Sequence, residues 1–469
     1  MMVKYDLAIL GGGPGGYVAA IRSAQIGMKT AIIEKDKLGG ICLNWGCIPT
    51  KALLKNAEVV HYIKNAEKYG INISDYTLDF SHSIARSRDV ADRLSKGIAF
   101  LMKKNNINHV IGEGYLSSKT TIEVKNDKGK ETIHAEKIIL ATGGSPQILP
   151  GMKLDGKCII SYKEAMVLKS IPSKLIIIGS GAIGVEFAYF YNAYGTEVHL
   201  IEMLPNVLPI EDEEISKELA RNFNKLGIKI YPNTTVQQIE LKNDKPQVKM
   251  ERQGKVETLE GDIALVAVGI TGNIAGIGLE EIGISTENGF ISINEYNQSS
   301  IPSIYAIGDV TGPPWLAHVA SAQGHVAVEH AAGNEIKPID YSNIPNCTYC
   351  QPQVASLGLT EASAVEKGFQ VKIGRFDFRA SGKAAAIGDT TGFVKLVFDR
   401  ELGELLGAHI VGSEATEMIA ELGVAKLFEA TWDELAGTIH AHPTLSEAFT
   451  EAVRDINGQS IHLPSRTKS

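Results

Sequence analysis

The sequence predicts an α/β fold made of two Rossmann-like dinucleotide-binding domains and a C-terminal α+β domain. Two observations predict the nucleotide-binding domains: a pattern of strand, glycine loop and helix occurs twice, and an acidic residue ends each copy. The third is length, since 469 residues exceed what one hydrophobic core usually accommodates. We expect the first domain at 1-149, the second at 150-269, a return to the first at 270-340, and the last domain at 341-469.

The first copy of the pattern opens the chain. Residues Lys4 to Leu10 form an apolar run typical of a buried strand, and a glycine-rich turn follows at Gly11 to Gly16. Helical patterning continues through Gln25, and a second strand at Thr30 to Ile33 ends in Glu34. This order predicts a βαβ unit with the glycine turn at the start of its helix.

The second copy repeats the first in the middle of the chain. A strand is expected at Lys174 to Ile178, followed by a glycine turn at Gly179 to Gly184. A helix through Tyr194 and a strand at Glu197 to Ile201 come next, and Glu202 ends the unit. The chain is therefore expected to bind two dinucleotides.

The glycine spacing has a physical reason. The first glycine permits a tight turn, the second lets a pyrophosphate approach the backbone, the third lets helix and strand pack closely, and the helix N-terminus favours negative charge. In both copies the acid lies 18 positions after the third glycine, which disfavours the alternative of two ordinary tight turns. The candidate nucleotide-binding residues are Gly11, Gly13, Gly16 and Glu34 in the first copy and Gly179, Gly181, Gly184 and Glu202 in the second.

The acids bear on the choice of nucleotide. Glu34 and Glu202 suit ribose hydroxyls, because a carboxylate accepts a hydrogen bond from a 2′-hydroxyl but repels a 2′-phosphate. Met203 and Leu204 follow Glu202, and no arginine adjoins them. The second copy is therefore expected to prefer NAD to NADP.

Later segments indicate where the chain changes domain. Short strands that end at Gly143 and Gly269 look like exits from the two nucleotide folds, and Pro150 to Pro172 suggests the passage between them. A strand at Ser303 to Ile307 with Asp309 at its tip is interpreted as a return to the first domain. The last domain is expected to contain strands at Val354 to Leu359, Phe393 to Phe398 and Leu406 to Val411, and a helix within Glu414 to Ala430.

Composition narrows the function classes. The net charge of −8 and the absence of a Lys/Arg cluster make nucleic acid and anionic membranes poor partners. Apolar stretches are too short to span a membrane, and the N-terminus lacks a signal-peptide layout. Five cysteines in a chain of this length do not make a disulfide framework. We expect a cytoplasmic protein, or one of the mitochondrial matrix if this is a processed form.

Cys42 and Cys47 are the candidate redox pair. Residues five apart on a regular helix lie about 7.5 Å apart along its axis, whereas a disulfide needs Cα atoms about 4.4 to 6.8 Å apart. An irregular backbone is therefore expected, for which Gly46 and Pro49 are suited. A small strained ring would be reduced more easily than a structural bridge. The alternative is a metal pair, but no neighbouring cysteine or histidine completes a ligand set, so no metal is expected.

The run from Gly39 to Lys51 closely resembles the active-site segment of the class I pyridine nucleotide-disulfide oxidoreductase family. The resemblance covers nearly the whole chain. It extends through Gly11 to Gly16, Ala141 to Gly143, the second glycine loop with Glu186, Gly308 with Asp309, and His440 to Glu447.

The resemblance implies a homodimer with FAD in the first nucleotide-binding unit and NAD in the second. It places Cys47 against the flavin and Cys42 in exchange with substrate, with His442 arriving from the partner subunit and Glu447 orienting it. It also implies an ion pair of Lys51 with Glu186 beside the flavin and further cofactor contacts from Gly40, Lys51, Gly114, Thr142, Gly143, Asp309, Ala317, Val236 and Gly269.

Acid–base chemistry supports the role of the histidine independently. A thiol with an ordinary pKa is a few per cent thiolate at neutral pH, so an imidazole that takes its proton accelerates attack. His442 would be that base, and Glu447 would fix its tautomer. The alternative is that Thr444 and Glu447 form only a helix capping box. His440 is expected to be structural.

The implied reaction is NAD-linked oxidation of dihydrolipoamide or of dihydrolipoyl groups on acyltransferase or carrier proteins, as in 2-oxo-acid dehydrogenase complexes or glycine cleavage. Two alternatives remain: another NAD(P)H-dependent disulfide reductase, and a non-catalytic flavoprotein that docks on a carrier complex. The first is disfavoured by Glu202 without a nearby arginine, and the second by the retention of Cys42, Cys47 and His442 together.

Two segments depart from the family pattern. Family members usually carry arginine directly after the glycine of the second exit strand, but here Ile270 follows Gly269. Cys347 and Cys350 form an unusual CxxC, which is either a second redox centre or, as we expect, packing in an interface strand.

Overall fold

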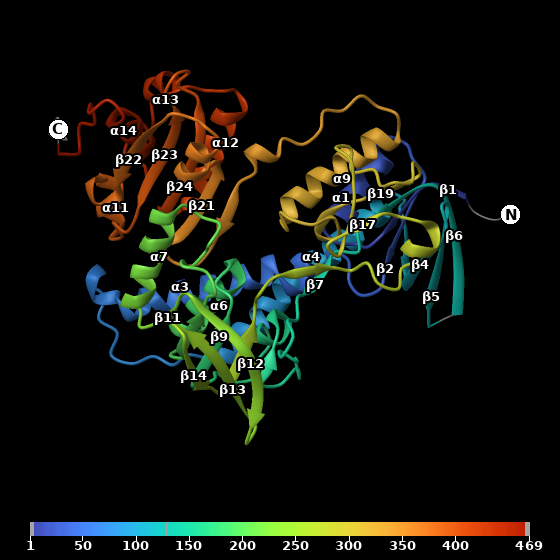
Figure 1. Ribbon diagram of the computed structural model, residues 1–469, viewed down its shortest axis with the longest axis horizontal. Helices are drawn as coiled ribbons and strands as arrows, with labels where there is room; N and C mark the ends of the chain where they lie inside the picture. The colour runs from blue at the N-terminus through green and yellow to red at the C-terminus, as the bar shows by residue number, and fades with distance from the viewer. Residues whose placement is uncertain (1–3, 128, 465–469) are drawn as a thin grey trace.

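The structure is a computed structural model that describes residues 4–127 and 129–464. Its first sheet has the strand order β3-β2-β1-β6-β5-β4, with β19 alongside β6 (Figure 1). The strands are β1 Lys4–Leu10, β2 Thr30–Glu34, β3 Asn108–Ile111, β4 Glu113–Ser118, β5 Thr121–Asn126, β6 Gly129–Leu140 and β19 Ile304–Ala306. Because β19 runs parallel to β6, the predicted return of the chain to the first sheet is confirmed.

Strands β4 and β5 fold over one face of this sheet, and helices cover the other face. The helices of this part of the chain include the one that begins at the expected glycine turn. They are α1 Pro14–Gln25, α2 Gly40–Trp45, α3 Cys47–Lys64, α4 Phe80–Lys104 and α9 Ala317–Ala331, with α8 Leu279–Ile282 at the edge. Helices α1 and α9 pack so closely that a Cβ on Gly324 would lie 2.8 Å from the Gly15 carbonyl oxygen. The first predicted βαβ unit is therefore confirmed, with α1 between the parallel strands β1 and β2.

The second sheet is fully parallel and has the order β11-β10-β9-β15-β8. Its elements are β8 Ile159–Ile160, α5 Tyr162–Ala165, β9 Lys174–Ile178, α6 Ala182–Ala193, β10 Glu197–Ile201, α7 Glu213–Lys225, β11 Lys229–Tyr231 and β15 Ile263–Val266. An antiparallel sheet that the sequence reasoning missed is inserted before β15, formed by β12 Thr234–Lys242, β13 Lys245–Arg252 and β14 Lys255–Glu260. The second βαβ unit is also confirmed.

The two chain connections between these sheets are held together by a pair of short strands. Strands β7 Gly144–Pro146 and β16 Ile270–Gly272 follow the exit glycines and pair antiparallel. Asn273 ties them further, since its side chain donates to the Thr142 carbonyl at 2.9 Å and accepts from the Ser145 hydroxyl at 2.7 Å. Strands β17 Thr286–Glu287 and β18 Phe290–Ile291 lie on the return segment.

The C-terminal part forms an antiparallel sheet with the order β20-β21-β24-β23-β22, drawn in orange and red in Figure 1. Its elements are β20 Asn346–Thr348, β21 Gln353–Gly358, α10 Glu361–Glu366, β22 Val371–Asp377, α11 Gly382–Ile387, β23 Phe393–Asp399, β24 Leu405–Gly412, α12 Ala415–Leu427, α13 Trp432–Gly437 and α14 Glu447–Asp455. The three predicted strands and the predicted helix are confirmed here to within a few residues at their ends. None of the helices in the described ranges is long and apolar enough to cross a membrane.

One cluster of buried side chains links three parts of the molecule. It contains Leu53 and Leu54 of α3, Phe187 and Phe190 of α6, and Val354 of β21. Helix α3, which begins at Cys47, therefore packs both on the second nucleotide fold and on the C-terminal sheet.

Candidate active site

The two glycine turns have the same geometry at the carboxyl ends of β1 and β9. A Cβ on Gly11 would lie 2.1 Å from the Ala141 carbonyl oxygen, and one on Gly179 would lie 2.3 Å from the Ala267 oxygen. Both glycines also have positive φ angles, 111° and 98°. The first glycine of each turn is thus required by the polypeptide itself.

The third glycines are fixed by close packing, whereas the second ones are not. Cβ atoms on Gly16 and Gly184 would lie 1.9 and 2.0 Å from the carbonyl oxygens of the first glycines. Gly13 and Gly181, the N-caps of α1 and α6, have no atom within 4 Å of a Cβ position. Open space at a helix N-terminus fits a pyrophosphate at both turns.

The acids at the ends of β2 and β10 hold the loops. One carboxylate oxygen of Glu34 accepts a hydrogen bond from the Gly12 N–H at 2.7 Å. The corresponding oxygen of Glu202 accepts from the Ser180 N–H and hydroxyl, each at 2.8 Å. Both acids therefore lie beside the open glycines, where a ribose would follow the pyrophosphate.

Asp309 lies in a short 3-10 helix after β19 and is the most informative polar group in the first nucleotide fold. Burial raises the pKa of its carboxyl from 3.8 to about 6. Within residues 4–127 and 129–464, no donor hydrogen bonds to this carboxylate. A part-buried carboxylate without a protein donor fits the hydroxyl groups of the ribityl chain of FAD.

The other predicted cofactor positions fall around the two turns. Thr142 and Gly143 follow β6, and Ala317 is the first residue of α9. Gly114 lies in β4 with its Cα packed on Leu10 of β1. Val236 lies at a register shift in β12, and Gly269 follows β15 with a φ of 128°.

Helix α2 connects the first glycine turn to the cysteines. A Cβ on Gly40, the first residue of α2, would lie 2.7 Å from the Cα of Gly13. Gly46, with φ −144° and ψ −115°, interrupts the helical conformation between α2 and α3. The expected irregularity is therefore at Gly46, whereas Pro49 lies inside the first turn of α3, where a missing N–H costs nothing.

Cys42 and Cys47 are free thiols with opposite pKa shifts. The hydrogen bond from Cys42 to Cys47, reinforced by burial, raises the pKa of the Cys42 thiol far above its ordinary value. The same hydrogen bond lowers the pKa of Cys47, and Lys51 and the α3 N-terminus lower it further against the effect of burial. Cys47 is thus the more stable thiolate of the pair.

Lys51 and Glu186 form the ion pair that the resemblance implied. The Lys51 ammonium contacts both carboxylate oxygens of Glu186 at 2.9 Å. Burial lowers the pKa of Lys51, but the Glu186 charge outweighs this effect and leaves that pKa raised. The ammonium is therefore held as a cation near Cys47.

His442 projects from the C-terminal domain and is 79% exposed in the single chain. Its Nδ1 lies 2.9 Å from one oxygen of Glu447, and the other oxygen accepts from the Thr444 N–H at 2.8 Å. Burial raises the pKa of Glu447, but these two hydrogen bonds outweigh it and leave that pKa lowered. The ring is oriented with Nε2 directed away from Glu447.

The alternative that Thr444 and Glu447 form only a capping box is wrong, since Glu447 accepts from the Thr444 N–H and also holds Nδ1 of His442. His440 is enclosed instead, with ring nitrogens 2.9 Å from the Thr450 hydroxyl and 2.6 Å from Glu421. This agrees with its expected structural role.

Arg88 is a site residue that the sequence reasoning missed. It lies on α4, donates to the Asn44 carbonyl at 2.6 Å, and places its guanidinium 4.9 Å from the centre of the Trp45 ring. It thus holds the end of α2 between the two cysteines. The contact joins residues 44 positions apart, and no local sequence pattern predicts it.

Cys347 and Cys350 belong to different cores. Cys347 in β20 packs against the core of the C-terminal sheet, and burial raises the pKa of its thiol to about 11. Cys350 is fully buried in the core that contains α3 and α6. Packing, the expected interpretation, fits both residues, and neither environment favours a reactive thiolate.

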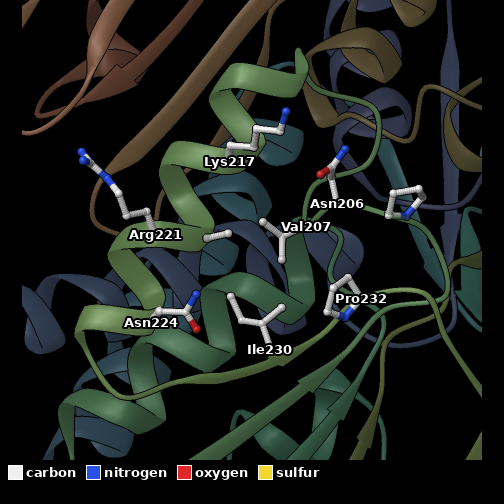
Figure 2. Close-up of a pocket in the computed structure, with 9 residues that line it drawn as sticks. Asn206, Val207, Lys217, Arg221, Asn224, Ile230 and Pro232 are labelled. Atoms are coloured by element: carbon white, nitrogen blue, oxygen red, sulfur yellow. The ribbon is translucent and has the colours of Figure 1, made fainter. Parts of the chain in front are cut away.

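A separate surface pocket of 330 Å³ lies between α7 and the loop after Glu202 (Figure 2). Lys217 and Arg221 of α7 border it, but they pair with Glu213 and Glu218 at 2.6 Å. Its basic groups are thus already neutralised on the helix, and we assign it no role.

The chain matches known proteins over nearly its whole length. Residues 5–324 match the model of the pyridine nucleotide-disulphide oxidoreductases, and residues 344–453 match the dimerisation domain of that family. The chain is 46% identical to the dihydrolipoyl dehydrogenase of Chlorobaculum tepidum, with 97% of both chains covered. It is 47% identical to that of Zymomonas mobilis, with 99% and 100% covered.

Solved structures agree in fold. LpdA from Mycobacterium tuberculosis superimposes with a TM-score of 0.90 and 28% identity, covering 97% of this chain and all of that one. The HOCl-induced flavoprotein disulfide reductase RclA from Escherichia coli gives 0.85 and 26%, covering 96% and 99%.

Fold and site together define a nucleotide-dependent disulfide oxidoreductase with a cysteine pair beside its first dinucleotide site. The chain belongs to the pyridine nucleotide-disulphide oxidoreductase family. FAD and NAD are the cofactors that this membership implies, and the open glycines, the acids and the unpartnered Asp309 carboxylate fit them.

Proposed function

We propose that the protein oxidises protein-bound dihydrolipoyl groups to lipoyl and reduces NAD to NADH through the Cys42–Cys47 pair, the activity for which its relatives are named. The observation that carries this is the pair itself: two thiols with opposite pKa shifts at the start of α3, joined to the first glycine turn by α2 and facing Lys51.

The pKa order supports a separate role for each cysteine. In thiol–disulfide exchange the sulfur with the lower pKa leaves more readily. Attack by a substrate thiolate on Cys42 therefore breaks the Cys42–Cys47 bond with the electron pair left on Cys47. The second thiolate of the substrate then attacks the substrate sulfur that is bonded to Cys42. This closes the lipoyl disulfide and releases Cys42 as a thiolate that is then protonated.

His442 of the partner subunit would take the proton from the substrate thiol at Nε2 and return it to Cys42. Support comes from its 79% exposure and from Glu447, which holds Nδ1. The same domain also exposes apolar side chains that a second subunit could cover, namely Leu402, Val424, Leu427, Phe428 and Ile439. The match of this domain to a dimerisation domain supports a homodimer.

FAD, when bound, supplies a path for the electron pair from the reduced cysteines to the nicotinamide. Gly13 and Glu34 would hold it with Asp309, while Gly181 and Glu202 would hold NAD. The Lys51 ammonium would lie near the reacting end of the flavin and favour its reduced form.

Partners, compartment and domain limits complete the proposal. The lipoyl group would be carried by the acyltransferase of a 2-oxo-acid dehydrogenase complex or by a glycine-cleavage carrier. The free thiols of Cys158, Cys347 and Cys350, outside the redox pair, suit a reducing compartment such as the cytoplasm. The divisions 1-149, 150-269, 270-340 and 341-469 remain our proposed domains.

The test compares two activities of the FAD-loaded dimer: NAD-linked oxidation of dihydrolipoamide and NADPH-linked reduction of glutathione disulfide. We expect the first alone, lost in Cys42→Ser and retained in Cys158→Ser, because the Cys158 thiol donates to the Asp244 carbonyl at 3.3 Å and lies outside the proposed site. Activity confined to glutathione disulfide would contradict the substrate. An oxidised-flavin spectrum that NADH leaves unchanged would favour the non-catalytic docking subunit.

A further inference from the structure

Tyr349 of the C-terminal domain touches both members of the Lys51–Glu186 pair. Its backbone N–H donates to Glu186 Oε1 at 2.9 Å. Its ring centre lies 4.4 Å from the Lys51 ammonium nitrogen. One residue therefore supplies a hydrogen bond to the carboxylate and an aromatic face to the cation.

The neighbours of Tyr349 prevent it from moving independently. Thr348 is 1% exposed and pairs with Val354 across β20 and β21. Cys350 is completely buried in the core shared with α3 and α6. The ring is thus fixed to the C-terminal sheet on one side and to the helix of the cysteines on the other.

Position matters because Lys51 has a flexible side chain that is 33% exposed. An ammonium this accessible gains hydration if it swings outward, and its attraction to a thiolate falls with distance. An aromatic face favours the ammonium in one place without adding a competing negative charge.

We propose that Tyr349 is a positioning residue that fixes the Lys51 ammonium between Glu186 and Cys47. It would thereby couple the position of the C-terminal domain to the stability of the Cys47 thiolate. This rests on the function proposed above. The titratable groups that face Lys51 or Cys47 are Tyr17, Cys42, Glu186, Cys347, Tyr349 and Cys350. Of these, Tyr349 alone is to be changed.

The experiment follows the long-wavelength absorbance of the two-electron-reduced, FAD-loaded dimer as pH is varied. On the proposed function, this band would report the Cys47 thiolate beside the flavin. Tyr349→Leu keeps the backbone N–H but removes the ring. The pH midpoint of the band is therefore expected to rise by roughly half a pH unit to one pH unit, which is about a three- to tenfold increase in the affinity of the thiolate for a proton. Tyr349→Phe keeps the ring and is expected to titrate like the unchanged protein.

Val354→Ala is the matched control, because it loosens the same strand pair and core without contacting the ion pair. The inference is overturned if Tyr349→Leu leaves the midpoint unmoved, if Val354→Ala moves it equally, or if Tyr349→Phe moves it as far as the leucine variant. If the leucine variant does not fold, Tyr349→Met replaces it. A band absent from the unchanged protein would instead overturn the proposed function, so the two failures are distinct.

Discussion

Replacing Gly181 by alanine is expected to weaken NAD binding about 10- to 100-fold while the protein still folds and retains FAD. No atom lies within 4 Å of a Cβ at Gly181, and its φ of −66° suits any residue. The new methyl group would therefore meet only the nucleotide. Loss of charge-assisted hydrogen bonds to a pyrophosphate costs about 1.5 to 3 kcal/mol, which gives this range.

The neighbouring glycine supplies the opposite outcome. A Cβ on Gly184 would lie 2.0 Å from the Gly179 carbonyl oxygen, so Gly184→Ala must push α6 away from the loop. Such overpacking costs about 1 to 3 kcal/mol or more. We therefore expect Gly184→Ala to have a lower unfolding midpoint than Gly181→Ala, because alanine at the Gly181 cap costs only about 1 kcal/mol or less in stability.

The assay measures NAD affinity by calorimetry, bound FAD by absorbance and stability by thermal unfolding. Gly13→Ala is the mirror control, expected to reduce FAD occupancy, because Gly13 has the same open surroundings in the first turn. Unchanged NAD affinity in Gly181→Ala would refute the assignment of the second turn to NAD. Equal destabilisation by Gly181→Ala and Gly184→Ala would refute the reasoning from Cβ contacts.

Three further predictions concern single charges. Glu447→Gln is expected to lower kcat with dihydrolipoamide about 10²-fold or more while FAD content is kept, because His442 loses the partner that fixes its ring. Asp309→Asn is expected to weaken FAD binding. Because burial raises the pKa of Asp309 from 3.8 to about 6, the folded FAD-free protein loses stability as pH rises through that interval. The variant should therefore be more stable above that window by up to about 3 kcal/mol in denaturant titrations. Lys395→Met leaves the Asp212 carboxylate, 4% exposed and 3.0 Å from Lys395, without that cation, and should cost about 3 to 5 kcal/mol in unfolding experiments.

Local signals explain why the nucleotide folds could be predicted. The glycine spacing and the acids Glu34 and Glu202 act within one βαβ unit, so the sequence alone contains the geometry. The inserted strands β12 to β14 show no comparable marker. Many residues of β12 and β14 are exposed, so these strands carry little periodic signal. Strand β13 does alternate, with Pro246, Val248 and Met250 buried, but the sequence reasoning did not use this alternation.

The candidate site divides in the same way. Cys42, Cys47 and Gly46 are close in sequence, and their irregular backbone follows from the distance that a disulfide needs. Tyr349 and Arg88 reach the site across the fold: Tyr349 contacts Glu186 over 163 positions, which no spacing rule encodes. The lysine–glutamate pair was found only through family resemblance.

The C-terminal domain does more than join two subunits, because it shares a core with the helix of the cysteines. Leu53 of α3, Phe187 of α6 and Val354 of β21 pack in one cluster. Protein cores are close-packed and transmit displacement from one element to the next. A dimer contact that fixes this domain therefore also fixes α3. On the function proposed above, the approach of His442 of the partner subunit to Cys42 would then be set by continuous packing and not by a flexible linker. Substitutions that leave small cavities in the shared core should therefore slow thiol exchange before they weaken FAD binding, since the glycine turns and Asp309 lie outside that cluster.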